Sequence, residues 1–373
     1  MKHRAFWGGM AAVAGAVLAL GACGNPIAHL TTERAIGNAV SNQLAQPGLN
    51  MQVSLGVTPA QLLELNRIEH GDASFTPQVA SSLSRTSLRI NVDPGHGESL
   101  QSKQFASDTN NRYEFAIQVG NAQPVQVRYV DGRLYARADL PTLISDFGGR
   151  ASTVTNVQRE LGEADLYVPG VAALGHGKWI SADPKALAPL LQRGASNSSN
   201  GNSAISQTDT RTLLNHIKSA LTSNTGYSNL GNHGGRTEYQ LKVRAHDFLQ
   251  SLRSTLPNDL SSIAGRAAVP GASSLGSQVS KAIDGALAKT PKNETIAFQL
   301  WVKDNRAQEI DVDVNQFVRK YPFAVPLRFV FAPAAPVTAP SNAAPLDFSK
   351  VSGLLGGLMG GAGGSRAILT PSA

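Results

Sequence analysis

The stretch VQVRYVDGRLYARA at residues 125–138 decides the fold. Val127 and Tyr129 alternate with glutamine and arginine, Asp131-Gly132 follows, and the alternation then resumes to the end of the stretch. Successive side chains of a β-strand point to opposite faces of its sheet, so this alternation predicts strands with one apolar and one polar face. Asp-Gly is typical of the two-residue turn that joins hairpin strands. The stretch therefore predicts two antiparallel strands.

The same alternation recurs along most of the chain. Asp304-Asn305 supplies a second hairpin turn. Because the strands follow one another mostly in hairpin order, the predicted fold class is α+β, with a mostly antiparallel sheet and helices over its apolar face. The other alternating stretches are residues 53–57, 88–92, 113–119, 239–243, 296–302, 310–314 and 327–331.

Helices are predicted between the strands. Thr58-Pro59 and Asp183-Pro184 each place a capping side chain before a proline at the first helical position. Residues 32–44 carry apolar side chains at helical spacing. Longer helices are expected over residues 209–223, 245–256 and 274–289.

A single domain is predicted over residues 32–333. The chain has 373 residues and a hydrophobic content of 42%, which is ample for one large core. The Ser/Asn/Gly-rich segment 194–206 is interpreted as a flexible loop within the domain. Residues 334–373 are rich in proline and alanine and then in glycine, which predicts a disordered tail.

The N-terminus has the layout of an export signal. Positively charged residues precede an apolar stretch over 6–20, which is too short and glycine-rich to span a membrane comfortably. Leu20-Gly21-Ala22-Cys23 then resembles the bacterial lipobox, which implies that Cys23 is acylated and becomes the mature N-terminus. Residues 1–22 are thus a predicted signal peptide and residues 23–31 a tether. The expected location is the extracytoplasmic face of the cell membrane, with membrane lipid as the first partner; a signal peptide or anchor with a coincidental cysteine is the alternative.

Charge and cysteine content exclude several classes of function. Cys23 is the only cysteine, so an intramolecular disulfide or a cysteine-based metal cluster is excluded. The formal charge is +7, and removing Lys2 and Arg4 upstream of Cys23 leaves 7 − 2 = +5. The cations form no run and have no interleaved aromatic residues, so no nucleic-acid partner is expected. Weak attraction to anionic lipid headgroups fits better.

One stretch favours an enzyme. Asp93-Pro94-Gly95-His96 resembles the zinc-binding start of cell-wall amidases, with His96 as a metal ligand and Glu114 as a candidate carboxylate. A zinc site needs further ligands, but His176 lies in a glycine-rich turn and His216 on a predicted helix. We therefore interpret the stretch as a hairpin turn and expect no enzyme activity, metal or cofactor. The zinc-dependent amidase stays an alternative.

Several segments, taken in order, resemble the actinobacterial lipid-binding lipoproteins of the LppX/LprG family. They are VDGRLYAR at 130–137, GKWIS at 177–181, the predicted helix at 212–222 with YQLKV at 239–243, and LWVKD at 300–304. Together with the lipobox, this order carries the resemblance over residues 36–331. The chain is longer than mature members of the family, and residues 245–289 correspond to an enlargement.

The resemblance implies a half-barrel like that of the Lol-type lipoprotein carriers, in which helices cover the concave face of a curved sheet. It implies a non-enzymatic lipoprotein that holds or passes on a lipid, a glycolipid or another amphipathic molecule in an apolar cavity, with an envelope protein as a further candidate partner. A filled extracytoplasmic interaction or sensor ectodomain without a ligand is the alternative. Alternate strand positions would line the cavity: Leu88, Ile90, Phe115, Ile117, Val127, Tyr129, Leu241, Phe298 and Leu300.

Overall fold

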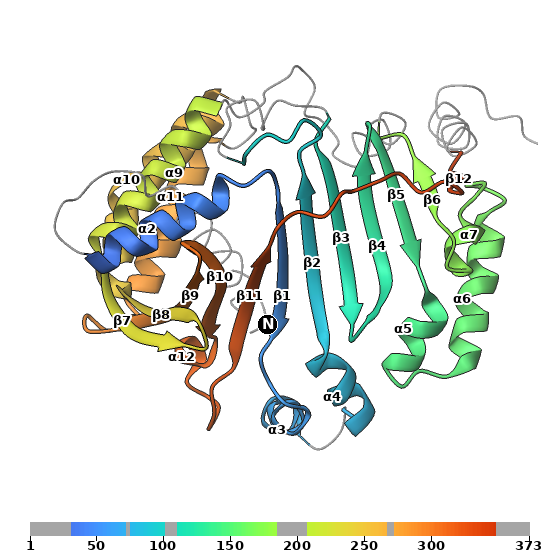
Figure 1. Cartoon of the computed structure of the whole chain (residues 1–373), viewed down its shortest axis with the longest axis horizontal. Helices are drawn as coiled ribbons and strands as arrows, with labels where there is room; N and C mark the ends of the chain where they lie inside the picture. Colours follow the sequence, from blue (N-terminus) through green and yellow to red (C-terminus); the bar gives the residue numbers. More distant parts are fainter. Residues whose placement is uncertain (1–30, 72–74, 101–109, 185–206, 267–271, 348–373) are drawn as a thin grey trace, which may run out of the picture.

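Twelve strands form one open, curved sheet in the computed structural model, which describes residues 31–71, 75–100, 110–184, 207–266 and 272–347 (Figure 1). The strand order is β12-β6-β5-β4-β3-β2-β1-β11-β10-β9-β8-β7, and every neighbouring pair is antiparallel except β12 and β6. The predicted α+β class with a mostly antiparallel sheet is confirmed. The strands are β1 (Leu49–Leu55), β2 (Thr86–Asp93), β3 (Arg112–Val119), β4 (Ala122–Val130), β5 (Arg133–Ala138), β6 (Ile180–Ala182), β7 (Thr225–His233), β8 (Arg236–Arg244), β9 (Thr295–Lys303), β10 (Arg306–Asp313), β11 (Pro326–Ala332) and β12 (Ala344–Pro345).

Both predicted two-residue turns are present. Asp131 and Gly132 have φ values of 49° and 77°, and Asp304 and Asn305 have φ values of 51° and 54°. Positive φ at both central residues is the geometry that matches the twist of antiparallel strands, and glycine, asparagine and aspartate adopt it most readily. The turn residues thus fix the register of β4 with β5 and of β9 with β10.

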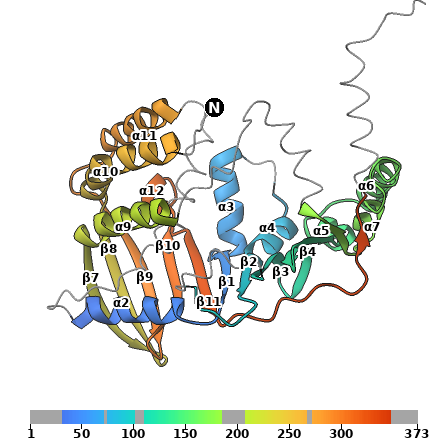
Figure 2. The ribbon, with the colours of Figure 1, turned by 90° about the horizontal axis from the view of Figure 1, so that it is seen from above.

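The helices lie around the sheet and at its two ends (Figure 2). Thr58 begins α3 as predicted, because its hydroxyl accepts from the Gln61 amide while the Gln61 side chain accepts from the Thr58 amide. The helices are α2 (Thr31–Leu44), α3 (Pro59–His70), α4 (Pro77–Ser84), α5 (Leu140–Asp146), α6 (Ala151–Ala164), α7 (Ala172–Gly175), α9 (Gln207–Ser223), α10 (Ala245–Arg266), α11 (Ala272–Leu287) and α12 (Asn315–Val318).

Two elements differ from the sequence prediction. Helix α10 continues through Pro257, where we expected it to end. Its partner α11 places Gly276 against the Pro257 carbonyl, and a Cβ at that glycine would lie 2.7 Å from the oxygen. This close packing outweighs the local effect of proline. Strand β7 lies where we predicted no strand; it is an edge strand with mostly exposed side chains, so it lacks the apolar alternation that marks the longer inner strands.

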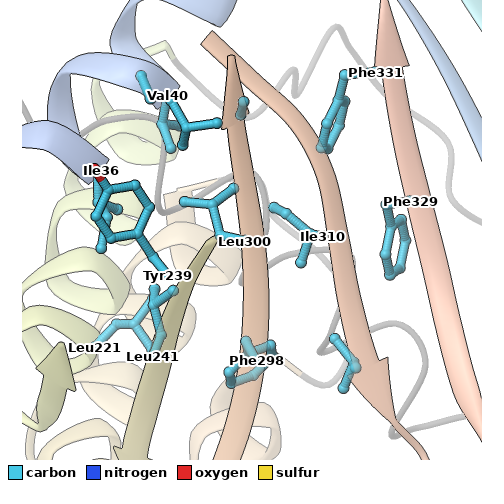
Figure 3. Close-up of a cluster of buried hydrophobic side chains, with 14 of the residues drawn as sticks. Ile36, Val40, Leu221, Tyr239, Leu241, Phe298, Leu300, Ile310, Phe329 and Phe331 are labelled. Atoms are coloured by element: carbon cyan, nitrogen blue, oxygen red, sulfur yellow. The ribbon is translucent and has the colours of Figure 1, made fainter. Parts of the chain in front are cut away.

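The main core lies over strands β8–β11. Ile36 and Val40 of α2 and Leu221 of α9 pack on side chains such as Tyr239 and Leu300 (Figure 3). The predicted amphipathic helix over 32–44 is therefore confirmed, and its apolar stripe meets the apolar face of the sheet. The core comprises Ile36, Ala39, Val40, Leu49, Leu221, Tyr239, Leu241, Val243, Phe298, Leu300, Val302, Ala307, Ile310, Val312, Leu327, Phe329 and Phe331.

The expected disordered tail is wrong for its first part. Residues 333–347, which we call the strap, cross the sheet in front of β1–β5 in Figure 1 and end in β12. The Asn91 side chain donates to the Ala335 carbonyl at 2.7 Å and accepts from its amide at 3.1 Å, and Asp93 accepts from the Val337 amide at 2.8 Å. These side chains satisfy the strap backbone, which composition alone could not reveal.

Several predictions fall on residues that the structure does not describe. They are the signal peptide over 1–22, the tether apart from its last residue, the loop over 194–206 and the tail beyond residue 347. No helix within the described residues is long and apolar enough to cross a membrane.

Candidate functional site

The predicted cavity residues divide into two groups. Leu241, Phe298 and Leu300 belong to the packed core, where Leu300 is only 1% exposed. Figure 3 shows them on β8 and β9 in a cluster that includes side chains of α2 and α9. Side chains of the protein already fill the space above them. In this structure, these three residues therefore contribute to stability rather than to an open cavity.

The other six residues form one continuous group on neighbouring strands. In register across β2, β3 and β4, Ile90 lies opposite Phe115, which lies opposite Val127. The adjacent row pairs Leu88 with Ile117. Paired residues of antiparallel strands share one face of the sheet, so the backbone brings these side chains together. We call this group the open apolar face: Leu88, Ile90, Phe115, Ile117, Val127 and Tyr129.

This face is open to solvent at its centre. Leu88 is 41% exposed and Phe115 is 44% exposed, and Ile117 is also exposed. Large apolar side chains on the inner strands of a sheet usually pack against a second layer. A fully buried side chain of this kind gains about 1.5–3 kcal/mol, so these residues forgo roughly 1 kcal/mol each in the free protein. A ligand that covered these side chains would recover this free energy of burial.

The open apolar face is continuous with the core. Met51 and Val53 of β1 lie opposite Ile90 and Leu88 on one side. On the other side, the same two residues lie opposite Phe331 and Phe329 of β11, which are buried. One side of the sheet thus passes from a packed region over β8–β11 to an exposed region over β2–β4. Helices α2 and α9 contribute side chains to the packed core over the first region.

The predicted strand over residues 53–57 overlaps β1 only at residues 53–55, and the prediction omitted the side chains of β1 from the site. Met51 and Val53 are half-buried, and Leu55 at the end of the strand is exposed. The alternation in residues 53–57 was the available signal. What it could not supply is the long-range register that sets β1 beside β2 and β11.

The opposite face of the same strands is polar and covered. Asn91 and Glu114 are nearly inaccessible and lie beneath the strap. The Arg128 guanidinium is 2.7 Å from the Glu114 carboxylate, donates to the Thr338 carbonyl and lies 4.9 Å from the centre of the Trp179 ring. Buried polar groups need partners, and this network provides them. Over β2–β4 the polar face is therefore the covered one and the apolar face the open one.

The amidase-like stretch forms a turn. The Gly97 amide donates to the Pro94 carbonyl, and His96 Nε2 lies 3.0 Å from the Asn110 side-chain amide. The candidate carboxylate of Glu114 is already bound to Arg128. Within the described ranges, no three histidine, cysteine, aspartate or glutamate residues gather in a way that could hold a metal ion.

The other histidines that the sequence raised lie apart from this turn. His216 on α9 contacts Asp259 on α10, with Nδ1 2.6 Å from the carboxylate. His176 follows α7. Cys23 and the lipobox residues Leu20, Gly21 and Ala22 lie outside the described residues, so lipid attachment stays a prediction.

Comparison with known proteins finds no family model that matches the chain and no curated protein that is significantly similar to it.

Proposed function

We propose that the chain is a membrane-anchored extracytoplasmic lipoprotein, acylated at Cys23, that holds a lipid or another amphipathic molecule on the open apolar face and passes it on. One observation carries the proposal: Leu88, Phe115 and Ile117 are exposed on inner strands of a sheet whose polar face is covered. A contiguous exposed apolar surface marks a place where a partner binds.

The chemistry of this surface favours an apolar ligand. The grid of Leu88, Ile90, Phe115, Ile117 and Val127 offers contact area but no charge. Apolar contact, rather than directed hydrogen bonds, would therefore select the ligand there. Tyr113 and Tyr129 pair in the last row, with ring centres 6.2 Å apart. Tyrosine combines an apolar ring with a hydroxyl, so this end of the face suits the boundary between an acyl chain and its polar headgroup.

The interaction or sensor module remains a second candidate because of the packed core over β8–β11. Such a module would use the open apolar face for a protein partner and would carry no lipid. The two candidates differ in what is recovered with the purified protein.

Native mass spectrometry of the full chain, purified from an actinobacterial host, tests the proposal. We expect a bound lipid that is lost in Phe115→Ser/Ile117→Ser and kept in Leu166→Ser/Tyr167→Ser. The control pair is matched because Leu166 and Tyr167 are exposed apolar residues in the turn between α6 and α7. Recovery of the wild-type chain without lipid, or equal retention in both variants, would count against lipid binding on this face.

A further inference from the structure

A second exposed apolar surface lies at one end of the sheet, in the connection between β10 and β11. Phe317 is 47% exposed and Val318 is also exposed. Both belong to the short helix α12, and Arg319 and Lys320 follow directly. We call Phe317–Lys320 the tip. Two apolar residues next to two cations are the composition of a segment that lies in a membrane interface.

The tip is held rigidly by polar side chains around it. The Asn315 side chain donates to the Tyr321 and Phe323 carbonyls and accepts from the Lys320 and Tyr321 amides. Asp313 accepts from the Asn315 and Val325 amides at 2.9 Å and 2.7 Å. Since both side chains use their hydrogen-bonding capacity on this one connection, the exposure of Phe317 and Val318 is a fixed feature of the loop.

A further contact joins α12 to the sheet. The Gln316 side chain accepts from the Ala297 amide at 2.7 Å and donates to the Ala297 carbonyl at 3.1 Å. Gln316 therefore faces β9, whereas Phe317 and Val318 are exposed. Helix α12 turns the polar side chains of Asn315 and Gln316 into the fold and leaves the apolar Phe317 and Val318 exposed. This is the reverse of the usual order for a surface loop.

The two cations of the tip keep hydrogen-bond donors for a further anion. Arg319 pairs with Glu294, and Lys320 lies 2.8 Å from Glu69. Both cationic side chains remain well exposed, and a guanidinium or an ammonium group has more donors than one carboxylate contact uses. Lys292 is exposed two residues before Glu294. Lys292, Arg319 and Lys320 against Glu69 and Glu294 leave a local charge of 3 − 2 = +1 around the apolar pair, and this sign suits a surface of phosphate groups.

The tip and the edge of the open apolar face lie at the same end of the sheet. The Gly56 amide, next to exposed Leu55, donates to the Pro326 carbonyl at 2.7 Å, directly after the loop that carries the tip. Tyr321 and Phe323 pack with Leu62 of α3 in one cluster. Figure 1 shows α12, α3 and α4 together at this end.

We propose that the tip docks on an anionic phospholipid surface, with Phe317 and Val318 in the interface and Arg319 and Lys320 against lipid phosphates. The docked protein would turn the Leu55 end of the sheet toward the bilayer. This contact adds to the attachment at Cys23 that the proposed function assumes, because a single lipid attachment restrains distance but not orientation. It is independent of ligand binding on the open apolar face.

A fluorophore at position 317 tests the proposal. With Cys23 acylated, Phe317→Cys gives the full chain one free thiol, and mass spectrometry checks that one environment-sensitive label is attached. The acylated protein is placed in vesicles of equal parts phosphatidylglycerol and phosphatidylcholine, or of phosphatidylcholine alone. Leu166→Cys is the matched control, because Leu166 is apolar, 71% exposed and distant in the fold, between α6 and α7.

We expect the label at 317 to shift to the blue and to be quenched by spin-labelled acyl chains in the anionic vesicles. The label at 166 should keep, in both kinds of vesicle, the emission of a water-exposed fluorophore. Arg319→Asn/Lys320→Gln should return the 317 label to that emission, and asparagine tolerates the left-handed backbone of Arg319 at φ 48°. Three results would each overturn the proposal. The label at 317 could keep the emission of a water-exposed fluorophore in anionic vesicles, or the labels at 317 and 166 could be quenched equally. The blue shift at 317 could also persist in Arg319→Asn/Lys320→Gln.

Discussion

Leu88 and Leu300 allow a matched test of how the sheet is covered. Both are leucines on inner strands, and both belong to the apolar side of the same sheet. They differ in exposure, at 41% for Leu88 and 1% for Leu300. Changing each to alanine removes the same atoms from the same kind of backbone. Any difference in how much unfolding free energy the two variants lose therefore measures the packing above each strand.

The expected costs differ clearly. Leu300→Ala removes a fully packed side chain and leaves a cavity beneath α2, which typically costs about 2–5 kcal/mol. Leu88→Ala forgoes only the buried part of its contacts and leaves no closed cavity, so we expect about 1 kcal/mol. Urea unfolding of lipid-free protein, followed by far-ultraviolet circular dichroism, measures both. At a denaturant dependence of about 2–3 kcal/mol/M, Leu300→Ala should lower the urea midpoint by roughly 1 M more than Leu88→Ala does.

Ligand binding adds a second comparison to this pair. If a lipid covers the open apolar face, repeating the measurement with lipid bound should raise the cost of Leu88→Ala and leave that of Leu300→Ala unchanged, because only Leu88 can contact the ligand. Equal costs for the two substitutions in the lipid-free protein would refute the reasoning. They would mean that β2 is packed as closely as β9.

Three further predictions concern other parts of the fold. Asn91→Ala leaves the Ala335 amide and carbonyl without their partner, so limited proteolysis should cut the strap faster, and the protein should lose about 1–3 kcal/mol in urea unfolding. Gly276→Ala should lower the thermal midpoint through its clash with α10, whereas Gly285→Ala on the same helix meets nothing within 4 Å and should raise stability by up to about 1 kcal/mol. Burial, followed by the hydrogen bond to Glu69, raises the pKa of Tyr321 to about 12. Its contribution to stability is thus complete below about pH 10 and lost as the pH rises through about 12, and unfolding measured across that range should depend less on pH in Tyr321→Phe.

The local features of the fold could be predicted from the sequence because their causes are local. The turns at Asp131-Gly132 and Asp304-Asn305 follow from backbone preferences, and the capping box at Thr58 involves residues three positions apart. Alternation likewise revealed the two faces of most inner strands. For these elements, nearby residues supply the whole physical reason.

The cover of each face could not be predicted in the same way. Asn91, Glu114 and Arg128 alternate with apolar residues as they would on a solvated strand face, yet they lie on the covered side. Their cover is the strap, more than 200 residues away in sequence from the side chains it binds. Proline and alanine in the strap indicated disorder, because composition does not show partners elsewhere. The tip was not predicted either, because the exposure of Phe317 and Val318 depends on how the whole loop folds and on the contact of Gln316 with β9.

The central claim is that an amphipathic ligand contacts the open apolar face. The most direct measurement places a photoreactive phenylalanine analogue at Phe115 or, as a control, at exposed Tyr167, and irradiates the full chain in its host membranes. Intact-mass analysis should then show a covalent lipid adduct for the analogue at position 115 and none at position 167. Adducts of equal yield at the two positions, or none at position 115, would contradict the account.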